Sequence, residues 1–505
     1  MHFRTASRPG LARRAEPAER GSGDGSAKRG RSRSPRDPCG KLRLPRNGIE
    51  LTSDKKILVV GAGLAGLASA YTLRKNGFDV TVLEAASHPG GRVVRRNVGG
   101  FQIELGANMF LETYAAAGQM AEELGVPLKR TPVPIHSGIY RNGRFHGLYG
   151  DNRPGNLWKT ARTILSFRLL PPRGVWQAVR FARMLQARKD DLSFDDHSRM
   201  LDLDTGESVA EFFETKIGTE SLEWLFGPGL TGYTFAHPEQ IGAAYAMATL
   251  WHVGLNGVAW PCLPEGGIGA FVDALVRACG PSVKLSAPVR RIVLEDGAAR
   301  GAVTDAGLIE ADAVICATTA TAALEIAPDL PPTVGDVLRR VTYSKCCRVF
   351  FGVDSSPFPQ GWYAVAFPRQ TGTLVAGMSD AAVLAPETVP KGKALIDALV
   401  IDKQAEILFA LSDDRVRERV LSEVLGFFPE MSREPLFTRV HRWPEAMCLA
   451  PGGTMTALYH MRREGFGGVK GLFLAGDYMG VPSVNAALQS GLDAAAAAAE
   501  CLRLG

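Results

Sequence analysis

The sequence predicts an α/β fold, and stretches near both ends of the chain carry that prediction. Residues 56–60 form a continuous apolar run, which is typical of a buried parallel strand. A glycine-rich turn and a helix over residues 67–76 follow, and residues 79–84 have the pattern of a second strand. Residues 471–477 form another short apolar strand, which leads into an alanine-rich helix over residues 486–502. These stretches predict a parallel sheet covered by helices.

The turn after the first strand contains three glycines, Gly61, Gly63 and Gly66. In a dinucleotide-binding βαβ unit the first glycine makes the tight turn, the second admits a pyrophosphate, and the third lets helix and strand pack closely. The helix N-terminus offers N–H groups and a positive dipole end to phosphates. Glu84 ends the second strand, where a carboxylate accepts hydrogen bonds from a ribose. The pattern predicts a dinucleotide site rather than an ordinary βα turn.

The residues after Glu84 indicate which dinucleotide binds. Gly90, Gly91 and Arg92 follow closely, and the whole segment resembles the extended fingerprint of the amine oxidase and protoporphyrinogen oxidase superfamily, which binds FAD. Arg92 would supply a forked donor to a phosphate or to the flavin. Residues 99–108 continue the resemblance with a segment that passes beside the flavin ring in the family. The resemblance implies that this segment contacts FAD through Gly106, Ala107 and Asn108.

The C-terminal strand and helix look like the second flavin motif of the same superfamily. There an acidic strand end touches the ribityl or pyrophosphate region, and the next helix points its N-terminus at the flavin pyrimidine edge, where its dipole favours negative charge. Residues 283–292 and 311–318 look like two further strands of this domain. The resemblance implies cofactor contacts from Val289, Gly476, Asp477, Val484, Asn485 and Ala486.

The order of these motifs predicts the domain organisation. The resemblance implies a Rossmann-type FAD-binding domain built from three segments, residues 54–130, 264–330 and 440–505. Two inserts, residues 131–263 and 331–439, are expected to form an α+β substrate (cap) domain. This arrangement is that of a flavin domain with a cap.

A second glycine cluster, within residues 263–271, looks like the turn by which family members re-enter the FAD domain. We expect no strand before it, and no acidic strand end follows at the right distance. The sequence therefore predicts one nucleotide-binding unit. With no second unit for NADPH, electrons are expected to leave to O2, with a quinone as the alternative acceptor.

The first residues differ from the rest in composition. Residues 1–53 carry a net charge of +8 against +6 for the whole chain, so the remainder is slightly acidic. Their Gly, Ser, Pro and Arg content predicts disorder. Four readings stay open: a transit peptide, a nuclear or nucleic-acid arm, a segment for anionic lipid, and an extension that precedes a shorter natural protein, which we favour.

The remaining composition predicts a cytoplasmic protein with reduced thiols. The eight cysteines include no C-x-x-C pair, and no His or Cys cluster has metal spacing, so we assign no metal. No stretch of the chain is apolar enough to cross a bilayer. Between residues 141 and 183 apolar and cationic side chains alternate at helical spacing. This pattern fits either amphipathic cap helices with a solvated basic face or a peripheral membrane contact.

The resemblance implies that the flavin carries the reaction by accepting a hydride. The expected function is oxidation of a C–H next to an amine nitrogen, with O2 reduced to H2O2; the alternative is porphyrinogen- or carotenoid-type carbon–carbon dehydrogenation. Lys345 lies in a predicted strand, residues 344–351, and resembles the amine oxidase lysine that holds a water against flavin N5. The alternative interpretation is that Lys345 is an ordinary surface lysine at the start of a strand. Trp443, in an Arg-Trp-Pro segment, is expected to wall the substrate pocket, with core packing as its alternative.

The expected cofactor and partners follow from the same resemblance. Cys448 lacks the Ser-Gly-Gly-Cys-Tyr context of a covalent flavin, so noncovalent FAD is expected. The partners are a small-molecule substrate and O2, with a homodimer as an open alternative and no nucleic acid. A hypothesis of another class, a nucleic-acid- or chromatin-associated protein, rests on the basic tail alone.

Overall fold

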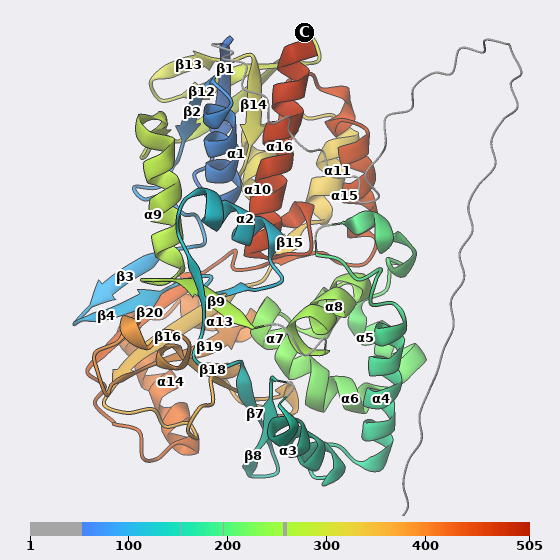
Figure 1. Ribbon diagram of the computed structural model, residues 1–505, viewed down its shortest axis with the longest axis vertical. Coiled ribbons are helices and arrows are strands. Elements are labelled where there is room, and N and C mark those ends of the chain that lie inside the picture. The colour runs from blue at the N-terminus through green and yellow to red at the C-terminus, as the bar shows by residue number, and fades with distance from the viewer. Residues whose placement is uncertain (1–52, 152, 195, 256–259, 505) are drawn as a thin grey trace, which may run out of the picture. The chain divides into compact units, whose positions relative to one another are not determined.

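The computed structural model describes residues 53–151, 153–194, 196–255 and 260–504 (Figure 1). The predicted basic tail, residues 1–53, lies outside the described residues except for Ser53. The described residues belong to one compact unit. The borders between an FAD domain and a substrate domain therefore stay a prediction.

A parallel sheet of five strands, in the order β10-β2-β1-β14-β22, contains the predicted βαβ unit. Helix α1 (Leu64–Lys75) joins the two strands that the glycine motif predicted. The last strand comes from the C-terminal part of the chain and pairs with β14. The strands are β1 (Ser53–Val60), β2 (Phe78–Leu83), β10 (Val283–Lys284), β14 (Ala313–Cys316) and β22 (Leu472–Leu474).

Different elements pack on the two faces of this sheet. Successive strand residues point to opposite faces, so neighbouring residues of β1 belong to different hydrophobic clusters. Ile57 and Val59 face the cluster that includes α1, α9 (Ile268–Cys279) and α16 (Val484–Leu504). Leu58 and Val60 face the opposite cluster. That cluster contains β11 (Val289–Glu295), β12 (Ala298–Thr304), β13 (Gly307–Glu310), α10 (Ala320–Ile326), α11 (Pro332–Arg340) and α15 (Thr454–Arg463).

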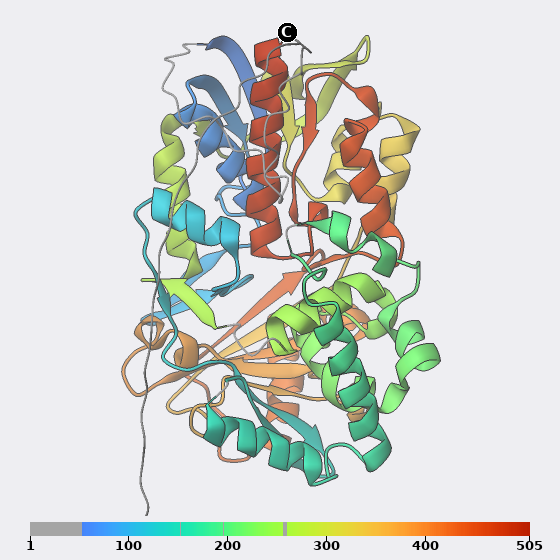
Figure 2. The same cartoon turned by 45° about the vertical axis from the view of Figure 1, so that its right-hand side comes forward.

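The first and last helices pack directly against each other, as Figures 1 and 2 show for α1 and α16. The Ser69 hydroxyl donates to the Gly491 carbonyl at 2.9 Å. A Cβ on Gly491 would overlap the Ala65 carbonyl, so the glycine permits this approach. The contact holds the two chain ends of the α/β body together.

A mixed sheet of seven strands, in the order β20-β16-β19-β18-β17-β7-β8, forms the second large element. One face packs against α13 (Asp402–Phe409) and α14 (Asp413–Phe427). The other face meets β3 (Arg95–Val98), which precedes the predicted flavin segment, and β4 (Phe101–Glu104), which lies within it. Its strands are β7 (His136–Arg141), β8 (Arg144–Tyr149), β16 (Cys346–Val353), β17 (Ala364–Ala366), β18 (Gly377–Asp380), β19 (Ala394–Ile401) and β20 (Phe437–Trp443).

Helices fill most of the insert between residues 153 and 255, and short strands form two small sheets elsewhere. The helices of the insert are α3 (Pro154–Leu165), α4 (Pro172–Ala187), α5 (Val209–Phe212), α6 (Thr219–Ser221), α7 (Gly227–Thr234) and α8 (Ala243–Thr249). Two further helices, α2 (Ala115–Glu123) and α12 (Ala381–Leu384), lie outside it. The short strands are β5 (Phe110–Leu111), β6 (Leu128–Arg130), β9 (Pro261–Pro264), β15 (Thr342–Tyr343) and β21 (Cys448–Leu449).

Two strand predictions differ from the structure. Residues 283–292 form two strands in different sheets, because the chain turns at Ser286, which has a φ of +52°. The expectation that no strand precedes the second glycine cluster was wrong, since β9 ends at Pro264. However, β9 pairs antiparallel with β5 and β6 and lies outside the parallel sheet, so this turn is not a second βαβ unit.

Candidate functional site

The first glycine turn has the close backbone approaches that its sequence predicted. The Gly61 N–H donates to the Leu83 carbonyl at 2.8 Å, and its φ of +101° is a conformation that favours glycine. A Cβ on Gly66 would overlap the Gly61 carbonyl, whereas one on Gly63 would meet no atom within 4 Å. Gly63 is the N-cap of α1 and has no side chain to cap it. The first-turn N–H groups of α1 therefore remain available to a phosphate.

The carboxylate of Glu84 is fixed beside this turn by two backbone donors. Its Oε2 accepts from the Ala62 N–H at 2.7 Å, and its Oε1 accepts from the Ala86 N–H at 2.9 Å. The Glu84 carbonyl accepts from the N–H of Ala287 at 2.8 Å, which brings the start of β11, and with it Val289, toward the end of β2.

The second glycine pair lies directly on the first turn. The Gly90 N–H donates to the Ala62 carbonyl at 2.8 Å, and a Cβ on Gly91 would lie 3.2 Å from the Cα of Gly63. Both Gly90 and Gly91 have positive φ, +104° and +58°. We call the group formed by Gly61, Gly63, Gly66, Glu84, Gly90 and Gly91 the glycine cradle.

Arg92 connects the glycine cradle to the C-terminal motif. Its Nη2 donates to Asp477 Oδ1 at 2.7 Å, and its guanidinium lies 5.5 Å from the centre of the Tyr343 ring. Burial opposes the charged form of Arg92, but the carboxylate of Asp477 outweighs this effect and raises the pKa of the guanidinium. The pair joins two residues that are 385 positions apart in the sequence.

The remaining C-terminal candidates lie around the start of α16. The Gly476 N–H donates to Ser490 Oγ at 2.9 Å, and the Ala486 N–H donates to Ser483 Oγ at 3.0 Å. The side chain of Asn485 is fully buried, and its Oδ1 accepts from the N–H groups of Ala116 and Ala117. Asn485 therefore caps α2. Val484 is the first residue of α16.

The segment from Leu105 to Asn108 is held between the glycine cradle and the mixed sheet. The Ala107 N–H donates to the Arg92 carbonyl at 3.1 Å, and a Cβ on Gly106 would overlap that carbonyl. Trp443 Nε1 donates to the Leu105 carbonyl at 2.8 Å. Asn108 Nδ2 donates to the Tyr363 hydroxyl at 3.1 Å. Trp443, predicted to wall the pocket, thus contacts the predicted flavin segment.

Sequence reasoning missed Arg348, which also holds this segment. Arg348 Nη1 donates to the carbonyls of Leu105 and Gly106 at 2.8 and 2.5 Å, and its Nε and Nη2 donate to Asp397. The side chains of Arg348 and Asp397 are only 5% and 10% exposed. The signal was visible in the sequence as a single arginine within the apolar stretch of residues 346–353.

The structure places Lys345 away from these segments. It lies just before β16, and its ammonium forms an ion pair with Glu406 on α13, where both side chains are nearly half exposed. Cys347 and Val349 also face α13 and α14, whereas Arg348 points to the opposite face and contacts Leu105. The predicted strand began two residues too early, and Lys345 has a surface ion pair instead of a place beside the glycine cradle.

Glu104 occupies the second glycine turn. Its Oε1 accepts from the Gly269 N–H at 3.1 Å, in the first turn of α9, and a Cβ on Gly267 would lie 2.5 Å from the same oxygen. The N-terminus of α9 is thus paired with a carboxylate of the chain itself. Glu104 Oε2 is buried without a hydrogen-bond partner among the described residues. Burial raises the pKa of Glu104 to about 7.

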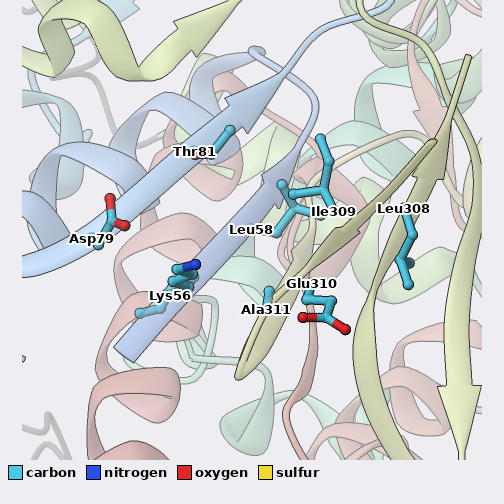
Figure 3. Close-up of a pocket in the computed structure, with 9 residues that line it drawn as sticks. Lys56, Leu58, Asp79, Thr81, Leu308, Ile309, Glu310 and Ala311 are labelled. Atoms are coloured by element: carbon cyan, nitrogen blue, oxygen red, sulfur yellow. The ribbon is translucent and has the colours of Figure 1, made fainter. Parts of the chain in front are cut away.

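A pocket of about 450 Å³ lies elsewhere on the parallel sheet (Figure 3). It is lined by Lys56, Ile57, Leu58, Asp79, Thr81, Leu308, Ile309, Glu310 and Ala311. These residues come from the middle of β1, from β2, from β13 and from Ala311, and none of them belongs to the glycine turn that follows β1. Ligands of open α/β sheets bind at the carboxyl ends of the strands, which argues against a nucleotide here.

The described residues contain neither a metal-binding cluster nor a membrane-spanning helix. No group of three or more His, Cys, Asp or Glu side chains could hold a metal ion in the part of the chain that the structure covers. Within the same residues, no helix combines the length and the apolar character needed to cross a bilayer.

The residues of the glycine cradle fit FAD. The α1 N-terminus provides N–H groups for a pyrophosphate, and the open side of Gly63 permits its close approach. Glu84 presents carboxylate oxygens for a ribose, and Arg92 with Asp477 supplies a charged donor and acceptor from the two chain ends. This donor set is the one a dinucleotide requires.

Comparison with known proteins identifies the family. The family described as flavin containing amine oxidoreductase matches residues 64–499. The chloroplastic/mitochondrial protoporphyrinogen oxidase 2 of Arabidopsis thaliana is 30% identical over 41% of this chain and 37% of its own length. A coproporphyrinogen III oxidase of Bacillus subtilis is 22% identical over 85% of this chain and 95% of its own length. The first two curated relatives are matched over only 37% and 53% of their lengths.

Solved structures show the same fold. A putative protoporphyrinogen oxidase from an Exiguobacterium species has a TM-score of 0.70 at 20% identity, covering 88% of this chain and 98% of its own. A putrescine oxidase has a TM-score of 0.69 at 20% identity, covering 88% and 99%. The fold class predicted from the sequence is therefore confirmed. The chain belongs to the flavin-containing amine oxidoreductase family.

Proposed function

We propose that the protein is an FAD-dependent oxidase that dehydrogenates a carbon–carbon bond of a porphyrinogen- or carotenoid-type substrate. When bound, FAD would supply the hydride acceptor for this reaction. The substrate loses a hydride and a proton and gains a double bond, while O2 gains two electrons and two protons and becomes H2O2. A quinone is the alternative acceptor.

The position of Lys345 carries the choice of this reaction. The amine reaction predicted from the sequence rested on a lysine beside the flavin, and the ammonium of Lys345 is instead paired with Glu406 at the surface. Similarity to relatives supports the same choice, because the coproporphyrinogen III oxidase of Bacillus subtilis matches 95% of its own length.

Oxidation of an amine at the carbon beside its nitrogen, giving an imine, is the second candidate. It is supported by the structural similarity to putrescine oxidase, which has a TM-score of 0.69. A putative flavin-containing monoamine oxidase of Mycobacterium tuberculosis is also 26% identical over 80% of this chain.

The residues around the 105–108 segment are proposed to position the reacting groups. Trp443 and Arg348 fix the Leu105 carbonyl, which sets the path of the segment beside the flavin. The Asn108 side chain and the Tyr363 hydroxyl form a neutral hydrogen-bonded pair, which is proposed to orient the uncharged reacting part of the substrate. Such fixed dipoles act without reorganising during the reaction.

Anaerobic mixing of the yellow protein with candidate substrates tests the proposal. Porphyrinogens or polyenes are expected to bleach the flavin absorbance band, and admission of O2 is expected to restore it with formation of H2O2. Porphyrinogens also oxidise spontaneously in air. The decisive observation is therefore loss of the flavin absorbance band under anaerobic conditions. Bleaching by primary or secondary amines alone would contradict the proposal and support the second candidate.

A further inference from the structure

Exposed apolar side chains gather on one part of the molecule, the α3–α4 segment, which we define as residues 153–189. Isolated exposed apolar residues are normal, but a cluster marks an interaction surface. The two helices meet at the lower edge of both Figure 1 and Figure 2, where residues 166–171 connect them. Six of the ten large apolar side chains that are exposed among the described residues belong to it: Leu157, Trp158, Leu165, Phe167, Trp176 and Val179.

Packing within the chain does not explain these side chains. Helix α4 buries one face, which includes Phe181 and Leu185, while Trp176 and Val179 lie on the outer face. Helix α3 has no buried residue. Trp158 and Trp176 are 67% and 60% exposed. An ordinary surface helix directs its apolar side chains to the core and its charged ones to water, so the outward tryptophans require another partner.

The same segment is strongly basic. Residues 153–189 contain nine Lys or Arg and no Asp or Glu. Among the described residues, only Arg153 and Arg188 of these nine form ion pairs. The guanidinium of Arg180 lies 5.5 Å from the centre of the Trp176 ring, so cation and aromatic ring share one surface. The cations without an ion pair are Lys159, Arg162, Arg168, Arg173, Arg180, Arg183 and Lys189.

The connection between the helices also presents a large apolar side chain. Phe167 has a φ of +56°, a conformation that a bulky residue rarely adopts, and its side chain is half exposed. The neighbouring Leu169 and Leu170 are fully buried and anchor the connection. A strained backbone conformation persists only where the surrounding structure enforces it. The connection between α3 and α4 therefore holds the Phe167 ring outward.

We propose that the α3–α4 segment docks on an anionic lipid bilayer. The outward tryptophans and Phe167 would lie at the boundary between headgroups and acyl chains, and the cations would face lipid phosphates. Charge complementarity selects this partner, because unpaired cations surrounding aromatic and aliphatic side chains match an anionic interface. Nucleic acid would use the cations but leave Leu157, Leu165 and Val179 in water.

Co-sedimentation of the full-length flavoprotein with lipid vesicles tests this proposal. Vesicles of phosphatidylcholine alone are compared with vesicles of equal phosphatidylcholine and phosphatidylglycerol, at physiological salt. We expect binding to the anionic vesicles to be at least about tenfold stronger. Quenching of tryptophan fluorescence by lipids with brominated acyl chains should accompany binding.

A charge-preserving variant tests the contribution of the α3–α4 segment to vesicle binding separately from that of the basic N-terminal residues. Every variant retains those N-terminal residues. The triple variant W158S/F167S/W176S is expected to lose vesicle binding about tenfold or more and to lose the quenching. The matched control L308S/I407S/L436S removes three apolar side chains elsewhere that are each at least half exposed, and it is expected to bind like the parent protein. Both should keep the flavin absorbance of the parent.

Two results would overturn the proposal. Equal vesicle binding and quenching by the parent and the W158S/F167S/W176S variant would show that the segment does not touch the bilayer. Absence of vesicle binding, together with a dimer in gel filtration that this variant abolishes, would show that a second copy of the chain covers the surface instead.

Discussion

At the scale of single residues, the site depends on carboxylates whose environments differ sharply. Glu84, within the glycine cradle, accepts hydrogen bonds from two backbone donors, Ala62 N–H and Ala86 N–H. Glu104 has one donor, Gly269 N–H, and a second oxygen without a partner among the described residues. The first carboxylate is suited to bind a ribose, and the second to pair with a helix N-terminus.

Replacing Glu84 by glutamine is expected to weaken FAD binding. The amide nitrogen would face a backbone N–H, so one of the two hydrogen bonds is lost, and a hydrogen bond to a charged group contributes about 1.5–3 kcal/mol. FAD affinity should fall roughly 10- to 100-fold. The measurement is the ratio of flavin to protein absorbance after dialysis. Glu310→Gln, an exposed residue of β13, is the control. An unchanged ratio in Glu84→Gln would contradict the assignment.

The raised pKa of Glu104 predicts a pH-dependent stability. Its pKa rises through burial from 4.5 to about 7 in the folded protein, so the folded state binds this proton more tightly than the unfolded chain. Stability should therefore fall as pH increases from about 4.5 to about 7 and stay reduced above it. At about 1.4 kcal/mol per pKa unit, the upper bound is about 3 kcal/mol.

Glu104→Gln tests this effect because the variant is neutral at every pH and keeps an acceptor for the Gly269 N–H. Relative to the parent, its Tm should rise more at pH 8 than at pH 5 in thermal denaturation. Glu310→Gln should show no such difference between the two pH values. If the Tm of Glu104→Gln differs from that of the parent by the same amount at pH 5 and pH 8, Glu104 is ionised in the folded protein at both pH values.

At the scale of elements, strand alternation decides whether Arg348 in β16 or Lys345 just before it reaches the flavin segment. The sequence indicated a strand near residue 345 and identified its lysine, but neighbouring strand residues point to opposite faces. Arg348 points toward Leu105, whereas Lys345 pairs with Glu406. The glycine cradle could be predicted because its spacing is local. The Arg348–Asp397 pair could not, because it depends on the pairing of β16 with β19.

Removing Arg348 is therefore expected to loosen the link between the mixed sheet and the flavin segment. Arg348→Met leaves Asp397 buried without its cation, which costs about 3–5 kcal/mol. The Leu105 and Gly106 carbonyls also lose a donor. Urea denaturation and the fine structure of the flavin absorbance band should both change.

Two further variants distinguish the buried pair from a surface effect. R348M/D397L removes both charges and should recover most of the lost stability while the flavin band stays altered. Arg290→Met breaks an exposed pair with Asp305, which is screened by solvent, and should leave the stability almost unchanged. A loss of stability in Arg348→Met no larger than in Arg290→Met would contradict the structural role of Arg348.

At the scale of the whole molecule, the cofactor site joins parts of the chain that are distant in sequence. Arg92 meets Asp477, α1 packs on α16, and Asn485 caps α2. The sequence indicated that both ends contribute to one site, because each end carries a recognisable motif. The order of the helices between residues 153 and 255 could not be predicted, since amphipathic helices carry no signal for their neighbours.

This arrangement predicts that loss of FAD destabilises the fold as a whole. A ligand that binds the folded state alone stabilises it by about 2.7 kcal/mol at a free concentration of 100 times its Kd. Protein stripped of FAD should therefore unfold at a lower Tm, and added FAD should restore the Tm with a concentration dependence that saturates. Hydrogen exchange should accelerate in the first turns of α1 and α16 together, because both meet at the site. Faster exchange confined to α1 would show that the C-terminal motif does not hold the cofactor.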